Sequence, residues 1–410
     1  MWYGVCILSP KIFYVLIGMG NRLLKCICFL GVIVLLLNSM AAYAQSPTDT
    51  LLEPAKPDNP RRVLRRNLDG IPRYFYHGRD YGSEALYNPV TLVLNMGWDI
   101  GQLQNIDDRV FTFPFPSSAK HTFKNILRPV QPIKDMGAWK WVKSEVLPIS
   151  FYREGAQWLP NYTLHLFGGG MTYTNISEWY DAHGVRRPRL MGMITVVTGQ
   201  LMNEIIENQG WKGSNSDPIA DVYLFNLAGL IMFTSPKVNH FFSHTLNMAD
   251  WSHMPTFTVP HGTIQNQGQY FSLKYALPFY KPLRLFARLG MSTHLGLSYK
   301  FKNEYSISVG AGVRSYQLQF LDSAARQVTV TTTPTAGIFL DRNNTVVASL
   351  VWSHSTDNWF HAQMYPGVLR LGNFSPGLWA IIGREGYATF GIASKYTFGV
   401  GIGGEVNGPF

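Results

Sequence analysis

The C-terminal half of the chain alternates between apolar and polar positions with a period of two. From Leu285 to Phe301 nearly every second residue is apolar, and the residues between, apart from Phe286, are small, polar or basic. After a turn at Lys302–Asn303, the alternation resumes from Tyr305 to Arg314. Successive side chains of a strand point to opposite faces, so the pattern predicts β-strands. Glycine and serine on the polar face favour a membrane barrel, with lipid outside and a polar lumen, over a soluble β-protein.

Further short segments between turn signals predict more strands, about eight to twelve in all. They are Thr91–Asp99, Gln269–Leu277, Val328–Thr332, Val346–Trp352, Val368–Leu371, Leu378–Gly383 and Tyr387–Ser394. A last alternation runs from Tyr396 to Phe410 and ends in an aromatic residue. This strand resembles the C-terminal signal of Gram-negative outer-membrane barrels, although Pro409 and Asn407–Gly408 depart from the usual pattern. The resemblance implies the barrel-assembly machinery as a partner during biogenesis.

The middle of the chain breaks the alternation and predicts helices. The segment PRLMGMITVVTGQLMNEIIEN begins at Pro188 and stops before Gln209–Gly210, with proline and glycine at the expected ends. Asp217 as N-cap and Pro218 in the first turn predict a second helix. A third is predicted over Tyr162–Tyr180, where three consecutive glycines allow close helix packing.

The N-terminus has the features of a secretory signal peptide. Arg22 and Lys25 precede the apolar run Cys26–Leu37, and Ala42-Tyr43-Ala44 supplies small residues at a cleavage site. Met19 is a plausible start, and an uncleaved membrane anchor is the alternative interpretation. All three cysteines precede Ala44, so the predicted mature chain contains no disulfide or thiolate site.

These observations predict a mainly β protein: an antiparallel outer-membrane β-barrel with an α-helical insert. The expected divisions are a signal peptide (1–44), a linker and N-terminal segment (45–84), a first β segment (85–134), the α-helical insert (135–235) and the C-terminal half of the barrel (236–410).

Composition narrows the possible partners. Only 15% of residues are charged and 14% are aromatic, which is typical of a β-rich protein in contact with lipid. The net charge of +10 suits anionic headgroups, so we expect outer-membrane lipid and lipopolysaccharide as partners. Basic residues are scattered apart from Arg61, Arg62, Arg65 and Arg66, which argues against nucleic acid.

Four carboxylates lie close together around the loop between the two best-defined predicted helices. Glu204 and Glu207 are near the end of one helix, and Asp217 and Asp221 are at the start of the next. His165 is the nearest basic candidate, and Asn226 extends the polar cluster. Three interpretations remain open: the carboxylates stabilise helix ends, they bind a divalent cation with His165, or His165 and Glu204 or Glu207 carry out acid–base catalysis.

A second group of histidines follows the helices. His240 and His244 are four residues apart, with Asp250 and His253 further along and His261 beyond them. This spacing permits a metal site if the segment is helical. The interspersed phenylalanine, tryptophan and proline favour a rim loop or an interfacial belt instead. The chain carries no motif that assigns a cofactor.

Four segments of the helical region, HLFGGGMTY, SEWYDAHG, NEIIEN and SDPIADVYLFNLAG, resemble an uncharacterised family of Gram-negative outer-membrane proteins with a domain of unknown function. There is also a faint similarity to VanZ-like membrane proteins, in which asparagine usually occupies the position of Asp221. The resemblance implies a membrane location and polar residues with no assigned reaction. The function expected from the sequence is structural, lipid-handling or solute passage; the alternative is an enzyme that modifies envelope lipid or glycan.

Overall fold

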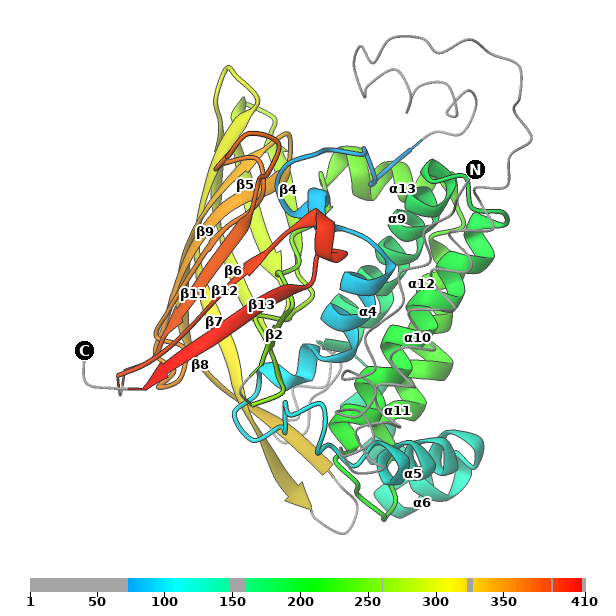
Figure 1. Ribbon diagram of the computed structural model, residues 1–410. Coiled ribbons are helices and arrows are strands. Elements are labelled where there is room, and N and C mark those ends of the chain that lie inside the picture. Colours follow the sequence, from blue (N-terminus) through cyan, green and yellow to red (C-terminus); the bar gives the residue numbers. More distant parts are fainter. Residues whose placement is uncertain (1–72, 148–159, 260, 323–326, 385, 408–410) are drawn as a thin grey trace, which may run out of the picture.

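The computed structural model describes residues 73–147, 160–259, 261–322, 327–384 and 386–407. A tall, twisted sheet forms one side of the molecule, and the helices pack along the other (Figure 1). The predicted signal peptide, most of the linker with its arginine cluster, and the terminal Phe410 lie outside the described residues.

The region predicted as a first β segment, 85–134, is helical, and that prediction is wrong. Its elements are η1 (Ser83–Leu86), α4 (Pro89–Gly97), η2 (Asp99–Gln102), α5 (Phe115–Leu127) and α6 (Val130–Met136). Asn88 caps α4, because its side chain accepts hydrogen bonds from the backbone N–H groups of Val90 and Thr91. A short apolar run such as Thr91–Asp99 does not distinguish a buried strand from a buried helix by periodicity.

The predicted helical insert is present. Its elements, continued to the start of the sheet, are α7 (Ala138–Trp141), η3 (Val142–Val146), η4 (Asn161–Gly168), α9 (Gly169–Ala182), α10 (Pro188–Asn208), α11 (Asp217–Ala220), η5 (Asp221–Asn226), α12 (Leu227–Met232), α13 (Pro236–His240) and η6 (Phe241–Thr245). Helix α10 matches its predicted bounds, and Gln209 after it is left-handed. Ser216, rather than Asp217, is the N-cap of α11. Asp217 is instead the first helical residue, because the helix begins one residue earlier than predicted.

No single helix among the described residues is long and apolar enough to cross a bilayer. One bent pair, Asp217–Met232 with Pro236–Thr245, passes the test of length and composition together, with a bend of 83°.

Glycines let the helices of the insert approach closely, as predicted. A Cβ atom on Gly170 would lie 2.3 Å from the ring of Phe233, and one on Gly229 would lie 2.5 Å from the carbonyl oxygen of Leu166. Both distances are too short for any larger residue. This contact sets α12 against α9 and holds the adjoining π-helical turns η4 and η5 side by side.

The sheet has thirteen strands among the described residues. They are β1 (Ala249–Asp250), β2 (Thr256–Thr258), β3 (Thr263–Gln265), β4 (Phe271–Leu277), β5 (Tyr280–Leu289), β6 (Ser292–Lys300), β7 (Tyr305–Asp322), β8 (Gln327–Arg342), β9 (Thr345–Ser353), β10 (Phe360–Met364), β11 (Gly377–Ile382), β12 (Tyr387–Ala393) and β13 (Gly401–Asn407). Their order is β1-β4-β5-β6-β7-β8-β9-β10-β11-β12-β13-β2-β3, and only the β13–β2 pairing is parallel. The strand pairing does not close, so the described residues form a large, mostly antiparallel sheet.

One short segment spans the two ends of this sheet. At its start, Trp251 donates a backbone hydrogen bond to Tyr270 next to β4, at 2.8 Å. At its end, Pro255 accepts one from Gly401 of β13, also at 2.8 Å. The apolar core between this segment and the inner face of the sheet includes Trp251, Phe286 and Phe339.

The alternation at Leu285–Phe301 belongs to two strands rather than one. Strands β5 and β6 are joined by the two-residue turn Gly290–Met291. An even number of turn residues keeps odd positions on one face in both strands, so the turn leaves no mark on the pattern. Val368–Leu371, also predicted as a strand, lies outside the strands, and Tyr396 falls in the short helix η7 (Lys395–Thr397).

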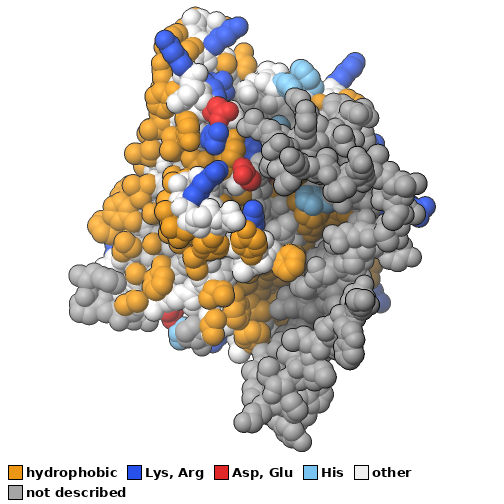
Figure 2. Space-filling model, turned by 45° about the horizontal axis from the view of Figure 1, so that its top comes forward, with side chains coloured by type: hydrophobic (Ala, Val, Ile, Leu, Met, Phe, Trp, Pro, Cys, Tyr) orange, Lys and Arg blue, Asp and Glu red, His pale blue; other side chains and the backbone are white. Residues whose placement is uncertain are grey.

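Burial on the sheet is the reverse of that in a soluble protein. The apolar positions Leu295, Leu297 and Val309 are 62, 49 and 53% exposed, whereas Ser298 and Ser308 on the other face are fully buried. Hydrophobic side chains accordingly cover the side of the molecule that the sheet forms (Figure 2). Apart from the apolar core around Phe286 and Phe339, the inner face is largely polar and includes Lys274, Arg288, His294, Arg314, Thr335 and Asp341.

A bulge turns the far end of the β7–β8 hairpin towards the helices. The register shifts between Ser315 and Gln317, so Tyr316 is an extra residue and the following positions exchange faces. The backbone oxygen of Tyr316 accepts a hydrogen bond from Gln104, at 2.8 Å. Beyond the bulge, Leu318 is buried in a cluster with Trp98.

Candidate functional site

Two π-helical turns carry the central residues of the predicted polar cluster. His165 lies in η4, and Asp221 and Asn226 lie at the two ends of η5. A π-helical turn inserts an extra residue into a helix and is frequent at functional sites. Here the two turns face each other, and Nδ1 of His165 lies 3.0 Å from Oδ1 of Asn226.

The four predicted carboxylates converge on this place from α10, α11 and η5. One group consists of His165, Glu204 and Asp221, and a second of Glu204, Glu207 and Asp217. Within each group, one potential ligand atom from every residue lies within 4.8 Å of the others. Glu204, Asp217 and Asp221 are buried, and Glu207 is half-buried. The predicted gathering of the carboxylates at a largely buried corner is confirmed.

Mutual repulsion and burial dominate the electrostatics of Asp221. Burial raises the pKa of its carboxyl group well above the usual range, and Glu204 and Asp217 raise it further. Its Oδ1 atom is enclosed and has no hydrogen-bond partner among the described residues. A bound cation would relieve both the repulsion and the missing contact.

Glu145 of η3 is a further buried carboxylate beside the cluster, which the sequence did not indicate. Burial raises its pKa well above the usual range, and the nearby Asp217 raises it further. Glu145 lies far from the other carboxylates in the chain, and no spacing relates it to them. Ser144 donates a hydrogen bond to one of its carboxylate oxygens, at 3.0 Å.

The hydrogen bond to Asn226 fixes the proton of His165. Because Oδ1 of Asn226 only accepts, Nδ1 of His165 carries the hydrogen and Nε2 presents a lone pair. Burial lowers the pKa of His165 to about 4, so its imidazole is neutral at neutral pH. Nε2 lies 3.6 Å from Oδ2 of Asp221. A lone pair facing a carboxylate oxygen at this distance is compatible with two ligands of one metal ion, and also with a hydrogen bond from a protonated Asp221.

The cluster opens onto a cavity of about 350 Å³ between the helices and the sheet. His165, Glu207, Asp217 and Asp221 line its helical wall. Its sheet wall includes Met291, Thr293, Val313 and Leu318. Thr293 and Val313 share the outer face of the sheet with the exposed Leu295 and Val309. The cavity therefore lies where the helices meet the apolar outer face.

This geometry bears on the interpretations left open by the sequence. The cluster lines a cavity rather than being sealed by helix caps, and Asp217 is not the N-cap. The hydrogen bonds predicted from backbone N–H groups to the carboxylates stay a prediction for Glu204, Glu207 and Asp217. A divalent-cation site and an acid–base site both remain compatible with the arrangement.

The second histidine group does not assemble into one site. His240 and His244 stack with ring centres 4.3 Å apart on an exposed surface. Asp250 is engaged by Ser252, whose backbone N–H donates to it at 3.0 Å. His253 is buried against Arg288, and His261 pairs with Glu405 at 2.6 Å. Among the described residues, no group of three potential ligands contains any of them.

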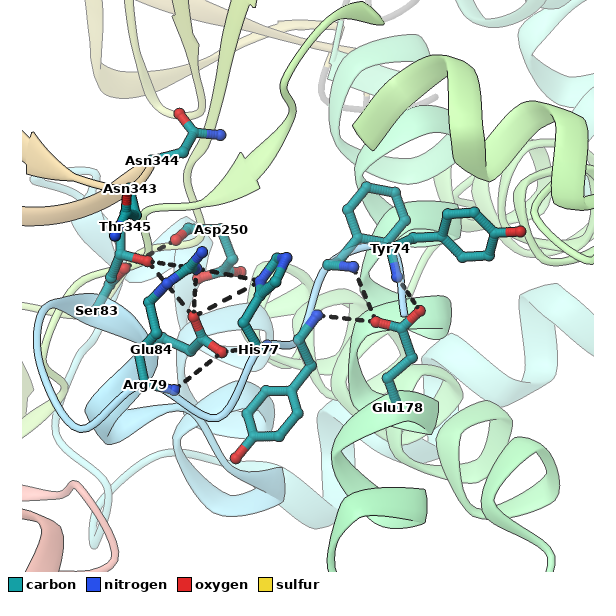
Figure 3. A network of polar contacts seen from close by, with 12 residues as sticks. Tyr74, His77, Arg79, Ser83, Glu84, Glu178, Asp250, Asn343, Asn344 and Thr345 are labelled. Atoms are coloured by element: carbon teal, nitrogen blue, oxygen red, sulfur yellow. Dashed lines mark hydrogen bonds and ion pairs between the residues drawn. The ribbon is translucent and has the colours of Figure 1, made fainter. Parts of the chain in front are cut away.

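A separate polar network ties the first described residues to both halves of the molecule (Figure 3). Glu178 of α9 accepts hydrogen bonds from the backbone N–H groups of Tyr74, Phe75 and Tyr76, at 2.7 to 2.9 Å. Burial raises the pKa of Glu178 to about 7. Nearby, Arg79 bonds Glu84 at 2.8 Å and Thr345 of β9 at 3.0 Å. These contacts fasten a chain segment and assemble no ligand set.

Comparison of the chain with models of protein families, with curated proteins and with solved structures gave no match. The resemblance to an uncharacterised outer-membrane family therefore stays a prediction.

Proposed function

We propose that this protein is an integral outer-membrane protein of a Gram-negative cell that binds a lipid headgroup at a divalent cation. In this proposal the sheet closes into a barrel and spans the membrane, and the helices lie outside the spanning part. The predicted signal peptide, 1–44, exports the chain, and outer-membrane lipid and lipopolysaccharide are its partners.

The observation that carries the proposal is the reversed burial of the sheet. In water, exposed rows of leucine and valine above fully buried serines would be unfavourable, because burial of apolar area drives folding. In lipid the same arrangement is favourable, since the outer face meets hydrocarbon and the polar groups satisfy one another inside. Leu295, Leu297 and Val309 are members of this outer face.

The place of the cavity supports a lipid as its occupant. A headgroup entering from the outer face would pass Thr293 and Val313 and meet the carboxylates and His165. Carboxylates alone would repel a phosphate, but a divalent cation held by them reverses the local charge and bridges to phosphate oxygens. His165, Glu204 and Asp221 would hold the cation, and Glu207 and Asp217 would complete its surroundings.

Replacing Leu297 by arginine is expected to destabilise the membrane-inserted protein by on the order of 2 kcal/mol, because the charge would face hydrocarbon. A half-exposed position on a soluble protein would change by only about 0.5 kcal/mol. Outer-membrane fractions are titrated with denaturant, and the folded fraction at each concentration is measured from its heat-modifiable mobility on a gel.

Leu297→Phe is the matched control and should fold like the wild type, because it keeps the position apolar. Wild-type protein that is periplasmic and released by washing would contradict the proposal. Equal stability of the Leu297→Arg variant and the wild type would contradict it as well.

The alternative function is modification of the bound lipid or glycan, and the position of Glu207 favours it. This half-buried carboxylate lines the cavity beside the residues that would hold the cation, and there it would serve as a general base. Glu207→Gln should then retain cation binding through His165, Glu204 and Asp221 but give the lipid and glycan profile of a deletion strain. A normal lipid and glycan profile in both the Glu207→Gln strain and the deletion strain would leave headgroup binding without modification as the function.

A further inference from the structure

A second cavity lies on the polar inner face of the sheet, well separated in its lining from the carboxylate cluster. Its volume is about 430 Å³, within the range of small-molecule sites. Arg314, His253 and His361 form part of its wall, and Asn266 and Gln267 of the loop before β4 lie beside them. The sheet contributes Arg314 from β7 and His361 from β10.

Arg314 lines this cavity, and a second buried arginine, Arg288, lies behind His253 of the lining. Arg288 of β5 and Arg314 of β7 flank strand β6, and both are at least 95% buried. None of the ion pairs in the described part of the chain includes either of them. Arg288 instead bonds Nε2 of His253 at 2.8 Å and lies 3.5 Å from the ring centre of Tyr270.

Most hydrogen-bond donors of Arg314 are unused. Its guanidinium has five N–H groups, and the described residues accept one bond, from Nη1 to Oγ of Ser292 at 3.4 Å. Nε of Arg314 is enclosed and has no hydrogen-bond partner among the described residues. Buried donors left unpaired are costly, so the site is built for an acceptor that bears negative charge.

Two carboxylates also line the same cavity. Asp108 accepts a hydrogen bond from Gln265 at 2.7 Å, and Asp357 accepts one from Gln104 at 2.9 Å and another from the hydroxyl of Ser355. These partners are neutral, which leaves the charge of both carboxylates available to a ligand. The cavity lining therefore carries side chains of both charges.

From this arrangement we infer that the inner cavity binds a small zwitterion, with a phosphate or carboxylate group at Arg314 and an ammonium group at Asp108 and Asp357. The inference goes beyond headgroup binding at the cation cluster and shares no residue with it. The ligand is either a free solute or the headgroup of a lipid, because both present the same groups.

Isothermal titration of the folded full-length protein in detergent tests the inference, with phosphoethanolamine, inorganic phosphate and ethanolamine as separate probes. Phosphoethanolamine is expected to bind most tightly. Arg314→Gln should weaken phosphoethanolamine by at least about tenfold, since charge-assisted hydrogen bonds are lost. Asp357→Asn should weaken phosphoethanolamine but leave inorganic phosphate unchanged. Arg342→Gln, at an exposed ion pair with Glu304, is the matched control and should bind like the wild type.

If Arg314→Gln does not fold, Arg314→Lys replaces it in the test, because it retains the positive charge. Arg314→Lys should bind phosphoethanolamine more weakly than the wild type, because the planar guanidinium with its paired N–H donors is lost. Phosphatidylethanolamine in the micelle that competes with the soluble probe would identify a lipid source, and absence of competition would identify a free solute. Equal affinity in the wild type, Arg314→Lys and Asp357→Asn, or no binding of any probe at millimolar concentration, would overturn the inference.

Discussion

Replacing Lys274 by alanine is expected to destabilise the folded protein by about 3–5 kcal/mol, because it leaves a buried carboxylate without its cation. Nζ of Lys274 on β4 bonds Oδ1 of Asp341 on β8, and both side chains are 1% exposed. The ammonium also lies 4.7 Å from the ring centre of Trp251. Denaturant titration with tryptophan fluorescence measures the loss.

Two further variants separate a buried charge from a general packing defect. The double replacement Lys274→Met with Asp341→Leu should recover most of the lost stability, since neither charge then remains. Arg342→Ala removes an exposed pair with Glu304 and should cost no more than about 1 kcal/mol. A cost for Lys274→Ala as small as that for Arg342→Ala would contradict the prediction.

A divalent cation is expected to raise the free energy of unfolding of the wild type by about 4 kcal/mol when its concentration is a thousandfold above the dissociation constant. Asp221→Asn should lose most of this gain, because it removes a central ligand. Without cation, the same variant should be as stable as the wild type or more stable, since repulsion from Glu204 and Asp217 is relieved. Thermal melts with calcium, magnesium or zinc, and with chelator, measure both effects.

Asp181→Asn provides a matched control on the outer side of α9, where Asp181 lies 3.4 Å from Arg73. This variant should respond to cation as the wild type does. Cation affinity should increase with pH, because protons and metal compete for the carboxylate of Asp221, whose pKa burial raises. A wild-type melting temperature that chelator does not change would favour a purely structural role for the cluster.

The long strands β5 to β9 could be predicted, because in a pleated sheet the side chains alternate between the two faces with the same period as the sequence. The short strands β1, β2, β3 and β10 could not, because each is too short to show an alternation. The alternation of apolar and polar residues did not reveal the turn at Gly290–Met291, because a turn of two residues leaves the alternation unchanged. Nor did it reveal α4, which is buried on most of its circumference and so appears as a continuous apolar run. The capping signal at Asn88-Pro89 was the available clue, because it marks the start of a helix.

The gathering of the carboxylates could also be predicted, because helix periodicity places Glu204 with Glu207 and Asp217 with Asp221. Glu145 could not, since it reaches the cluster through the packing of η3 against α11, which leaves no spacing in the sequence. Arg288 and Arg314 were visible as large cations on a face otherwise rich in glycine and serine. That contrast in size was the signal for the inner cavity.

The bulge at Tyr316 has a consequence for how related chains can vary in length. Between paired strands, an insertion of two residues keeps every side chain on its face of the sheet, whereas an insertion of one moves the following side chains to the opposite face. Tyr316 is such a single insertion, and it occurs at the point where the hairpin leaves the outer face and meets Trp98. Homologues without helices at this place would have no use for the extra residue. The presence or absence of this residue in a related chain would therefore indicate whether that chain has the helical half of the molecule.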